Sequence, residues 1–127
     1  MMPSEAVGSS PLDSFVRQGV GTGTITGVGL LLLAFPVIVF GPIGEELAFR
    51  GLLQPALSRW LSPAAAVGVT AVLFGSMHWY YGVMVPLAVF FGVVLGWARH
   101  VSGGLRAPIL IHMSINAVWF LAMVART

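Results

Sequence analysis

Long apolar stretches, separated by short polar breaks or breaks rich in glycine and proline, run through most of this chain. Each is long enough, or nearly so, to be a helix in a bilayer, where a span needs about 20 predominantly apolar residues. The stretches cover residues 19–43, 45–60, 63–81, 83–98 and 108–124. This pattern predicts an all-α integral membrane protein, a compact bundle of about four to five transmembrane helices.

The breaks carry recognisable start and stop signals for helices. Gly41-Pro42-Ile43-Gly44 predicts an end to the first helix, because glycine and proline interrupt helices. The second helix, with Pro55 inside it, covers only about 24 Å at a rise of 1.5 Å per residue. It could therefore cross a thinned region, kink at the proline, or lie partly within the bundle. Pro63 and Pro108 suit the first turns of the third and last helices, and Gly82 predicts a tight turn between two helices.

Composition supports a membrane protein and excludes several other classes. Hydrophobic residues make up 57% of the chain and charged residues only 8%, against about 25% charged in soluble domains. The absence of cysteine excludes disulfides, thiolate metal sites and thiol nucleophiles. The net charge of +2 is spread without a basic patch, so no nucleic acid partner is expected. Residues 1–18 are expected to form a short polar tail, and residues 19–127 a single membrane-embedded domain.

The arginines suggest an orientation in the membrane. If all five stretches cross the bilayer, four arginines fall on one side and Arg126 on the other; the four are Arg17, Arg59, Arg99 and Arg106. The positive-inside rule then places the amino terminus in the cytoplasm. We therefore expect a multi-pass protein of the cell membrane, in contact with the lipid bilayer.

Polar residues that lie inside the apolar stretches are the strongest functional signal. An ionisable side chain in hydrocarbon costs about 2.5 kcal/mol or more unless it is paired or faces a wet cavity, so such residues usually have a function. Glu46 and Arg50 are four residues apart and share a helix face, where they can form an ion pair. Glu45 points about 100° away around the helix and lacks that partner. It is the better candidate for a base, since desolvation makes a carboxylate more basic.

Two further helices offer polar groups with the same spacing of four residues. His112 and Asn116 share a face on the last helix, and His78 follows Phe74 on the third. Polar side chains that converge from facing helices are how catalytic and metal sites are built in bundles. Two mechanisms are compatible with these residues. In one, His78, His112 and an oxygen of Glu45 or Asn116 bind a divalent metal such as zinc. In the other, which needs no metal, Glu45 oriented with His78 activates water, and His112 with Asn116 stabilises the oxyanion.

Taken together, the three motifs resemble those of the CPBP family of intramembrane proteases. This is the CAAX-prenyl-protease and bacteriocin-processing group, also known as the Abi family. The resemblance rests on Glu45-Glu46-x-x-x-Arg50, Phe74-x-x-x-His78 and His112-x-x-x-Asn116, and it covers residues 40–122. It implies that Glu45 is the catalytic base, that His78, His112 and Asn116 complete the site, and that Glu46 and Arg50 support it. It also implies proteolysis at or within the membrane.

The leading hypothesis is an endopeptidase that cleaves a membrane-associated peptide or protein with water activated by Glu45. The alternative is a non-catalytic scaffold, or an immunity protein of the bacteriocin type, with the same fold. A third class, a small transporter with a proton relay, is disfavoured because the chain shows no inverted repeat. Many relatives have further helices before the first motif, so a homo-oligomer or a partner subunit could complete the cavity.

Overall fold

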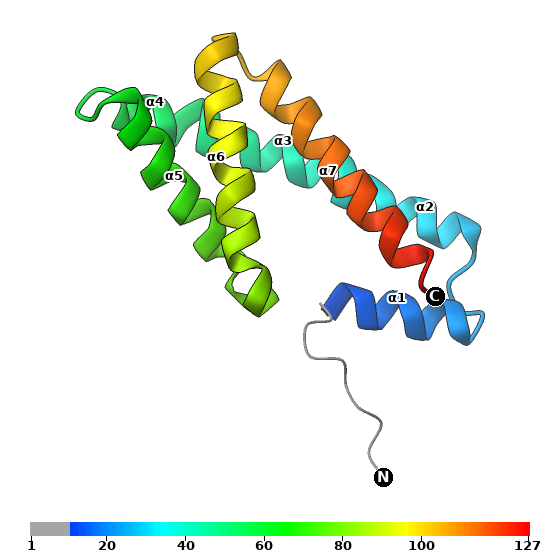
Figure 1. Ribbon diagram of the computed structural model, residues 1–127. Helices are drawn as coiled ribbons and strands as arrows, with labels where there is room; N and C mark the ends of the chain where they lie inside the picture. The colour runs from blue at the N-terminus through cyan, green and yellow to red at the C-terminus, as the bar shows by residue number, and fades with distance from the viewer. Residues whose placement is uncertain (1–10) are drawn as a thin grey trace.

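The computed structural model describes residues 11–127, apart from the side chains of Tyr81 and Val83, and this part of the chain is helical without strands (Figure 1). The helices are α1 (Pro11–Gly21), α2 (Gly27–Phe35), α3 (Gly41–Glu46), α4 (Gln54–Leu57), α5 (Pro63–Met77), α6 (Val85–Ser102) and α7 (Arg106–Val124). Two π-helical segments, η1 (Pro36–Phe40) and η2 (Leu47–Leu53), and the 3₁₀ segment η3 (Trp79–Met84) join them. The predicted all-α class is confirmed.

The segments from α2 to α4 follow one another without a break and form a single helix of 31 residues, Gly27–Leu57. The predicted end of a helix at residues 41–44 is therefore wrong, as is the division into separate helices over 19–43 and 45–60. At a rise of 1.5 Å per residue this helix is about 46 Å long. It places Glu45 well inside the helix and far from either end.

The first π-helical segment explains why Pro42 does not end the helix. The Gly41 N–H bonds to the carbonyl of Pro36, five residues back, in place of the usual four. Pro42 has no N–H of its own, so the wider register leaves the Val37 carbonyl without a backbone donor. One wide turn gives the proline ring room beside the preceding turn, and the helix continues beyond it.

The same arrangement recurs at η2, beside Pro55. The Gln54 N–H bonds to the carbonyl of Phe49, again five residues back. Pro55 offers no N–H, so the Arg50 carbonyl is the group left without a backbone donor. Pro42 and Pro55 thus each directly follow the residue that closes a π turn, whereas Pro36 is the first residue of η1.

Three helices are long and apolar enough to cross a membrane, namely Gly27–Leu57, Val85–Ser102 and Arg106–Val124, and the shorter apolar helix Pro63–Met77 accompanies them. The chain is a membrane-integral helical bundle with four apolar helices within residues 11–127, at the lower end of the predicted number. The starts of two helices agree with the sequence signals: Ser62 caps α5 ahead of Pro63, and Pro108 lies in the first turn of α7. Gly82 has a φ of 57° and forms the predicted turn.

The fusion of the first two predicted helices changes the expected topology. The α4–α5 and α6–α7 connections lie at one end of the bundle, and α1 lies beside the carboxyl end of α7 at the other (Figure 1). Arg17 in α1 is therefore at the opposite end from Arg59, Arg99 and Arg106, which corrects the predicted grouping. The positive-inside rule therefore favours a cytoplasmic position for the end of the bundle that carries the α4–α5 and α6–α7 connections, and not for the end at which α2 begins.

Residues 1–10 of the predicted polar tail lie outside the described residues. Residues 11–18 form most of α1, a helix with Val16 buried and Phe15 57% exposed. The division of the chain at residue 18 stays a prediction.

Helices α5 and α6 pack closely through small residues, and this contact fixes the frame on which the site is built. A Cβ added at Gly92 would lie 2.9 Å from the Ala71 Cα, and one added at Gly96 would lie 3.0 Å from the Val67 Cγ1. A larger residue at Gly92 would press on the backbone of α5, and one at Gly96 would press on the side chains of Val67 and Gln54. The two glycines bring the backbone carbonyls of α6 within reach of side chains from the long helix.

Candidate active site

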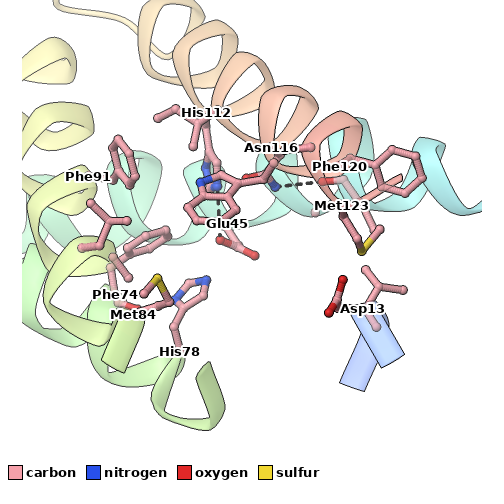
Figure 2. A pocket seen from close by; sticks show the side chains of 18 of the residues that line it. Asp13, Glu45, Phe74, His78, Met84, Phe91, His112, Asn116, Phe120 and Met123 are labelled. Atoms are coloured by element: carbon pink, nitrogen blue, oxygen red, sulfur yellow. Dashed lines mark hydrogen bonds and ion pairs between the residues drawn. The ribbon is translucent and has the colours of Figure 1, made fainter. Parts of the chain in front are cut away.

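All four side chains predicted to be catalytic, Glu45, His78, His112 and Asn116, line one cavity of about 420 Å³ (Figure 2). They come from α3, the end of α5, and two successive turns of α7. The remaining wall is mostly apolar, with side chains that include Phe74, Met84, Leu87, Phe91, Trp119 and Phe120. Ligand sites are typically apolar cavities with a few convergent polar groups, and this one has that character.

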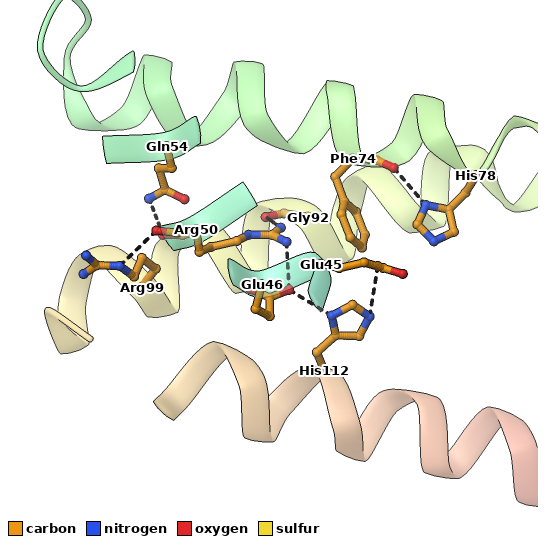
Figure 3. A network of polar contacts seen from close by, with 10 residues as sticks. Glu45, Glu46, Arg50, Gln54, Phe74, His78, Gly92, Arg99 and His112 are labelled. Atoms are coloured by element: carbon orange, nitrogen blue, oxygen red, sulfur yellow. Dashed lines mark hydrogen bonds and ion pairs between the residues drawn. The ribbon is translucent and has the colours of Figure 1, made fainter. Parts of the chain in front are cut away.

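Glu46 and Arg50 form a buried ion pair behind the cavity wall (Figure 3). Both side chains are 0% exposed, and Arg50 Nη1 donates to Glu46 Oε1 at 2.8 Å. Arg50 Nη2 donates to the Gly92 carbonyl at 2.9 Å, and the guanidinium carbon lies 4.7 Å from the centre of the Phe74 ring. The pair compensates two charges that neither water nor lipid could solvate at this place.

His112 connects this pair to the cavity. Its Nδ1 lies 2.8 Å from Glu46 Oε1, and its Nε2 lies 3.7 Å from Glu45 Oε2. An ionised carboxylate can only accept hydrogen bonds, so Nδ1 is the donor in the contact with Glu46. Glu46 therefore fixes the ring orientation and leaves Nε2 directed towards Glu45.

The two adjacent glutamates have different environments. The Glu45 side chain is 32% exposed and lines the cavity, whereas Glu46 is fully buried outside it. Within residues 11–127, Glu45 Oε2 has no hydrogen-bond donor. Glu46 Oε2 shares this lack, and both oxygens are buried, but of the two side chains only that of Glu45 lines the cavity. Glu45 is thus the carboxylate that can take a proton from a molecule in the cavity.

Asn116 has a structural contact that the sequence did not predict. Its Nδ2 donates at 2.9 Å to the carbonyl of Val37, the group that Pro42 leaves without a backbone donor. The side chain therefore replaces the missing N–H and fixes α7 against η1. One amide hydrogen and the Oδ1 remain for the cavity that Asn116 also lines.

His78 lies across the cavity from Glu45 and His112 (Figures 2 and 3). It ends α5 as its carboxyl-terminal cap, and its Nδ1 lies 2.8 Å from the Phe74 carbonyl. Its ring is 4.8 Å from the ring of Phe74, which in turn is 5.6 Å from that of His112. A substrate in the cavity would therefore lie between His78 on one wall and the Glu45–His112 pair on the other.

Sequence analysis missed two residues that stabilise the site from α4 and α6. Arg99 Nε donates to the Arg50 carbonyl at 3.2 Å, and Gln54 Nε2 donates to the Gly96 carbonyl at 2.9 Å. Pro55 was the signal for the contact of Arg99, because a proline five residues after Arg50 cannot donate to the Arg50 carbonyl in a π turn. The position of Gln54, one turn after Arg50 on the same helix face, was the signal for the second.

Whether the site holds a metal depends on how its histidines and carboxylates are grouped. Within residues 11–127, no three His, Cys, Asp or Glu side chains are grouped so that they could hold a metal, whereas catalytic zinc sites use three protein ligands. Glu45 Oε2 and His112 Nε2 are neighbours, but His78 lies on the opposite wall.

Residues 27–118 match the family model described as type II CAAX prenyl endopeptidase Rce1-like, and this range includes the polar site residues Glu45, Glu46, Arg50, His78, His112 and Asn116. The chain is also similar to an uncharacterized 24.3 kDa protein of Escherichia coli, with 32% identity over 116 residues. The matched region is 87% of this chain and 52% of that protein, so the chain spans about half the length of its curated relative. No solved structure matches the chain.

Proposed function

The chain belongs to the type II CAAX prenyl endopeptidase Rce1-like family, and we propose from this membership that it is an intramembrane endopeptidase for a membrane-associated peptide or protein. One observation carries the proposal. The Glu45 side chain is 32% exposed and lines a cavity between two histidines inside a membrane-integral bundle. A base with this access and these neighbours suits the activation of water.

The proposed reaction begins with water bound between Glu45 and His78. Glu45 takes one proton, and the oxygen of the water attacks the carbonyl carbon of the scissile peptide bond. The oxyanion that forms accepts hydrogen bonds from His112 Nε2 and from the amide of Asn116. Glu45 then gives its proton to the leaving nitrogen and the C–N bond breaks. The products are a carboxylic acid, which keeps the second proton of the water, and an amine.

This assignment makes a specific demand on His112. Since Nδ1 donates to Glu46 at 2.8 Å, Nε2 can donate to an oxyanion only when the ring is in its imidazolium form. The carboxylate of Glu46, itself paired with Arg50, offsets the charge of that form and holds the ring in place. Preorganised donors of this kind lower a barrier because they need no rearrangement during the reaction.

The apolar walls suggest the kind of substrate. Aromatic and aliphatic side chains from α6 and α7 surround the polar groups, so an extended peptide with apolar side chains would displace water from the cavity as it binds. Such a segment is provided by a membrane-associated peptide or protein that enters from the bilayer.

A non-catalytic scaffold is the second candidate, and the contact between Asn116 and Val37 favours it. The polar groups of the motifs could serve only to cap irregular turns and pair buried charges. Glu45 discriminates between the two functions, because its oxygen Oε2 caps nothing within residues 11–127.

The test compares peptide termini in membranes of cells that express the wild type, Glu45→Gln or Ser114→Ala at matched levels. Ser114 is an exposed residue of α7 that does not line the cavity, so Ser114→Ala serves as the matched control. We expect new peptide ends with the wild type and the control, and none with Glu45→Gln. If all three proteins are folded and abundant and produce the same ends, the proposed proteolysis is wrong and the scaffold is favoured.

A further inference from the structure

Behind the ion pair lie three buried polar atoms that have no hydrogen-bond partner within residues 11–127: Arg50 Nε, Gln54 Oε1 and Thr70 Oγ1. Arg50 and Thr70 are 0% exposed and Gln54 is 5% exposed. Buried polar groups in native proteins are nearly always paired, with protein or with an ordered water. If these three atoms lie close together, one molecule that hydrogen-bonds to all of them would satisfy them.

Two contacts align α5 with the end of the long helix. The guanidinium carbon of Arg50 lies 4.7 Å from the centre of the Phe74 ring. One turn further along, Gln54 and Val67 meet at α6, since a Cβ added at Gly96 would lie 3.1 Å from Gln54 Oε1 and 3.0 Å from Val67 Cγ1. Residue numbers rise along one helix as they fall along the other, so the two helices run antiparallel here.

This alignment places Thr70 between the other two groups. Thr70 follows Val67 by three residues and precedes Phe74 by four, so all three share one face of α5. Because Phe74 lies at the level of Arg50 and Val67 at the level of Gln54, Thr70 lies at a level between Arg50 and Gln54. Its complete burial is consistent with a position in this contact.

The remaining hydrogen bonds prevent Arg50 and Gln54 from turning to satisfy these atoms. Arg50 donates through Nη1 to Glu46 and through Nη2 to the Gly92 carbonyl. Gln54 donates through Nε2 to the Gly96 carbonyl. If its amide were flipped, Gln54 Oε1 would face the Gly96 carbonyl oxygen, and the two would repel each other. The Nε–H of Arg50 and the Oε1 of Gln54 are thus the groups of these two side chains that remain for a further partner.

We propose that one water molecule binds between Arg50, Gln54 and Thr70. It accepts a hydrogen bond from Arg50 Nε, donates one to Gln54 Oε1, and forms a third with the Thr70 hydroxyl, which can donate or accept. One donor, one acceptor and one hydroxyl match the roughly three hydrogen bonds of a typical buried water. This water is separate from the one that Glu45 would activate, and it links α5 to the arginine that pairs with Glu46.

Nuclear magnetic resonance of the ¹⁵N-labelled full chain in detergent micelles tests this site directly. The Arg50 Nε–H is expected to show a direct dipolar cross-peak to water in the wild type and in Thr70→Ser, which keeps the hydroxyl. Thr70→Val has the same shape without the hydroxyl, and we expect it to lose that cross-peak. The measurement is independent of any peptidase activity, so its failure and the failure of the proposed function are distinguishable.

Two results would overturn the proposal: a resolved Arg50 Nε–H without a water cross-peak in the wild type, or an unchanged cross-peak in Thr70→Val. A crystal structure of the wild type provides a second measurement, with density for a water expected between the three atoms. If the space is empty in such a structure, or if Thr70 and Gln54 bond directly, the site does not exist. The wild type and Thr70→Ser decide the question even if Thr70→Val does not fold.

Discussion

Replacement of Glu46 by glutamine should be among the most destabilising single substitutions in this chain, although it changes only one oxygen to an NH₂ group. Arg50 is fully buried and keeps its charge, because a guanidinium does not lose its proton in proteins. Loss of one partner of a buried ion pair costs about 3–5 kcal/mol. Glutamine retains an acceptor for Arg50 Nη1, and Glu45 remains nearby, so we expect a loss of about 3 kcal/mol, at the lower end of this range. That is a large part of the roughly 5–15 kcal/mol by which folded proteins are stable.

The double variant Glu46→Gln with Arg50→Met shows whether the unpaired charge is the cause. With the guanidinium removed no charge is left uncompensated, so we expect the double variant to be more stable than Glu46→Gln alone. Arg17→Gln is a matched control, because Arg17 pairs with Asp13 at the same spacing but is 46% exposed. It should cost less than about 1 kcal/mol. Equilibrium unfolding in mixed micelles, followed by tryptophan fluorescence, measures these three variants and the single variant Arg50→Met. Additive effects of Glu46→Gln and Arg50→Met would refute the reasoning.

The other predictions concern contacts with the backbone and use the same unfolding measurement. Asn116→Leu removes the donor to the Val37 carbonyl and should cost about 1–3 kcal/mol; no loss would mean that another donor takes its place. Arg99→Met removes the donor to the carbonyl at η2 and should have an effect in the same range, or smaller, since Arg99 is only partly buried. Gly92→Ala should cost about 1–3 kcal/mol, because its Cβ would press on the backbone of α5. Gly68→Ala is the control, because its Cβ would meet nothing within 4 Å, and it should be neutral or stabilising by up to about 1 kcal/mol. Similar losses of stability for both glycine variants would refute the packing argument.

The sequence was informative about the site because hydrocarbon makes polar residues conspicuous. Glu45, His78, His112 and Asn116 were selected as interruptions of apolar helices, and they line one cavity. The spacing of four residues also predicted the contact between Glu46 and Arg50, which is present at 2.8 Å. The catalytic roles of these residues stay predictions. Periodicity was sufficient here because each pair lies on a single helix.

The sequence was misleading where a proline met a helix that tertiary contacts hold together. Pro42 and the glycines beside it were interpreted as a break, but η1 absorbs the proline and the helix continues. The helix tolerates Pro42 because Asn116, which is far away in the chain, donates a hydrogen bond to the Val37 carbonyl that the proline leaves without a donor. Local pattern cannot reveal such a partner, and the same is true of Arg99 at η2.

The two π turns also determine the direction in which the carboxylates face. Glu45 and Glu46 lie in α3, with one π-helical segment on each side. A π turn contains one residue more than an α turn, which rotates whatever follows it by about 100° relative to an uninterrupted helix. The direction in which the side chains of α3 face is therefore set separately from the directions faced by the helical segments before and after it. Deletion of one residue from η1 would turn the glutamates away from His112 while leaving the motif Glu45-Glu46-x-x-x-Arg50 intact, so an unbroken motif does not guarantee a formed site.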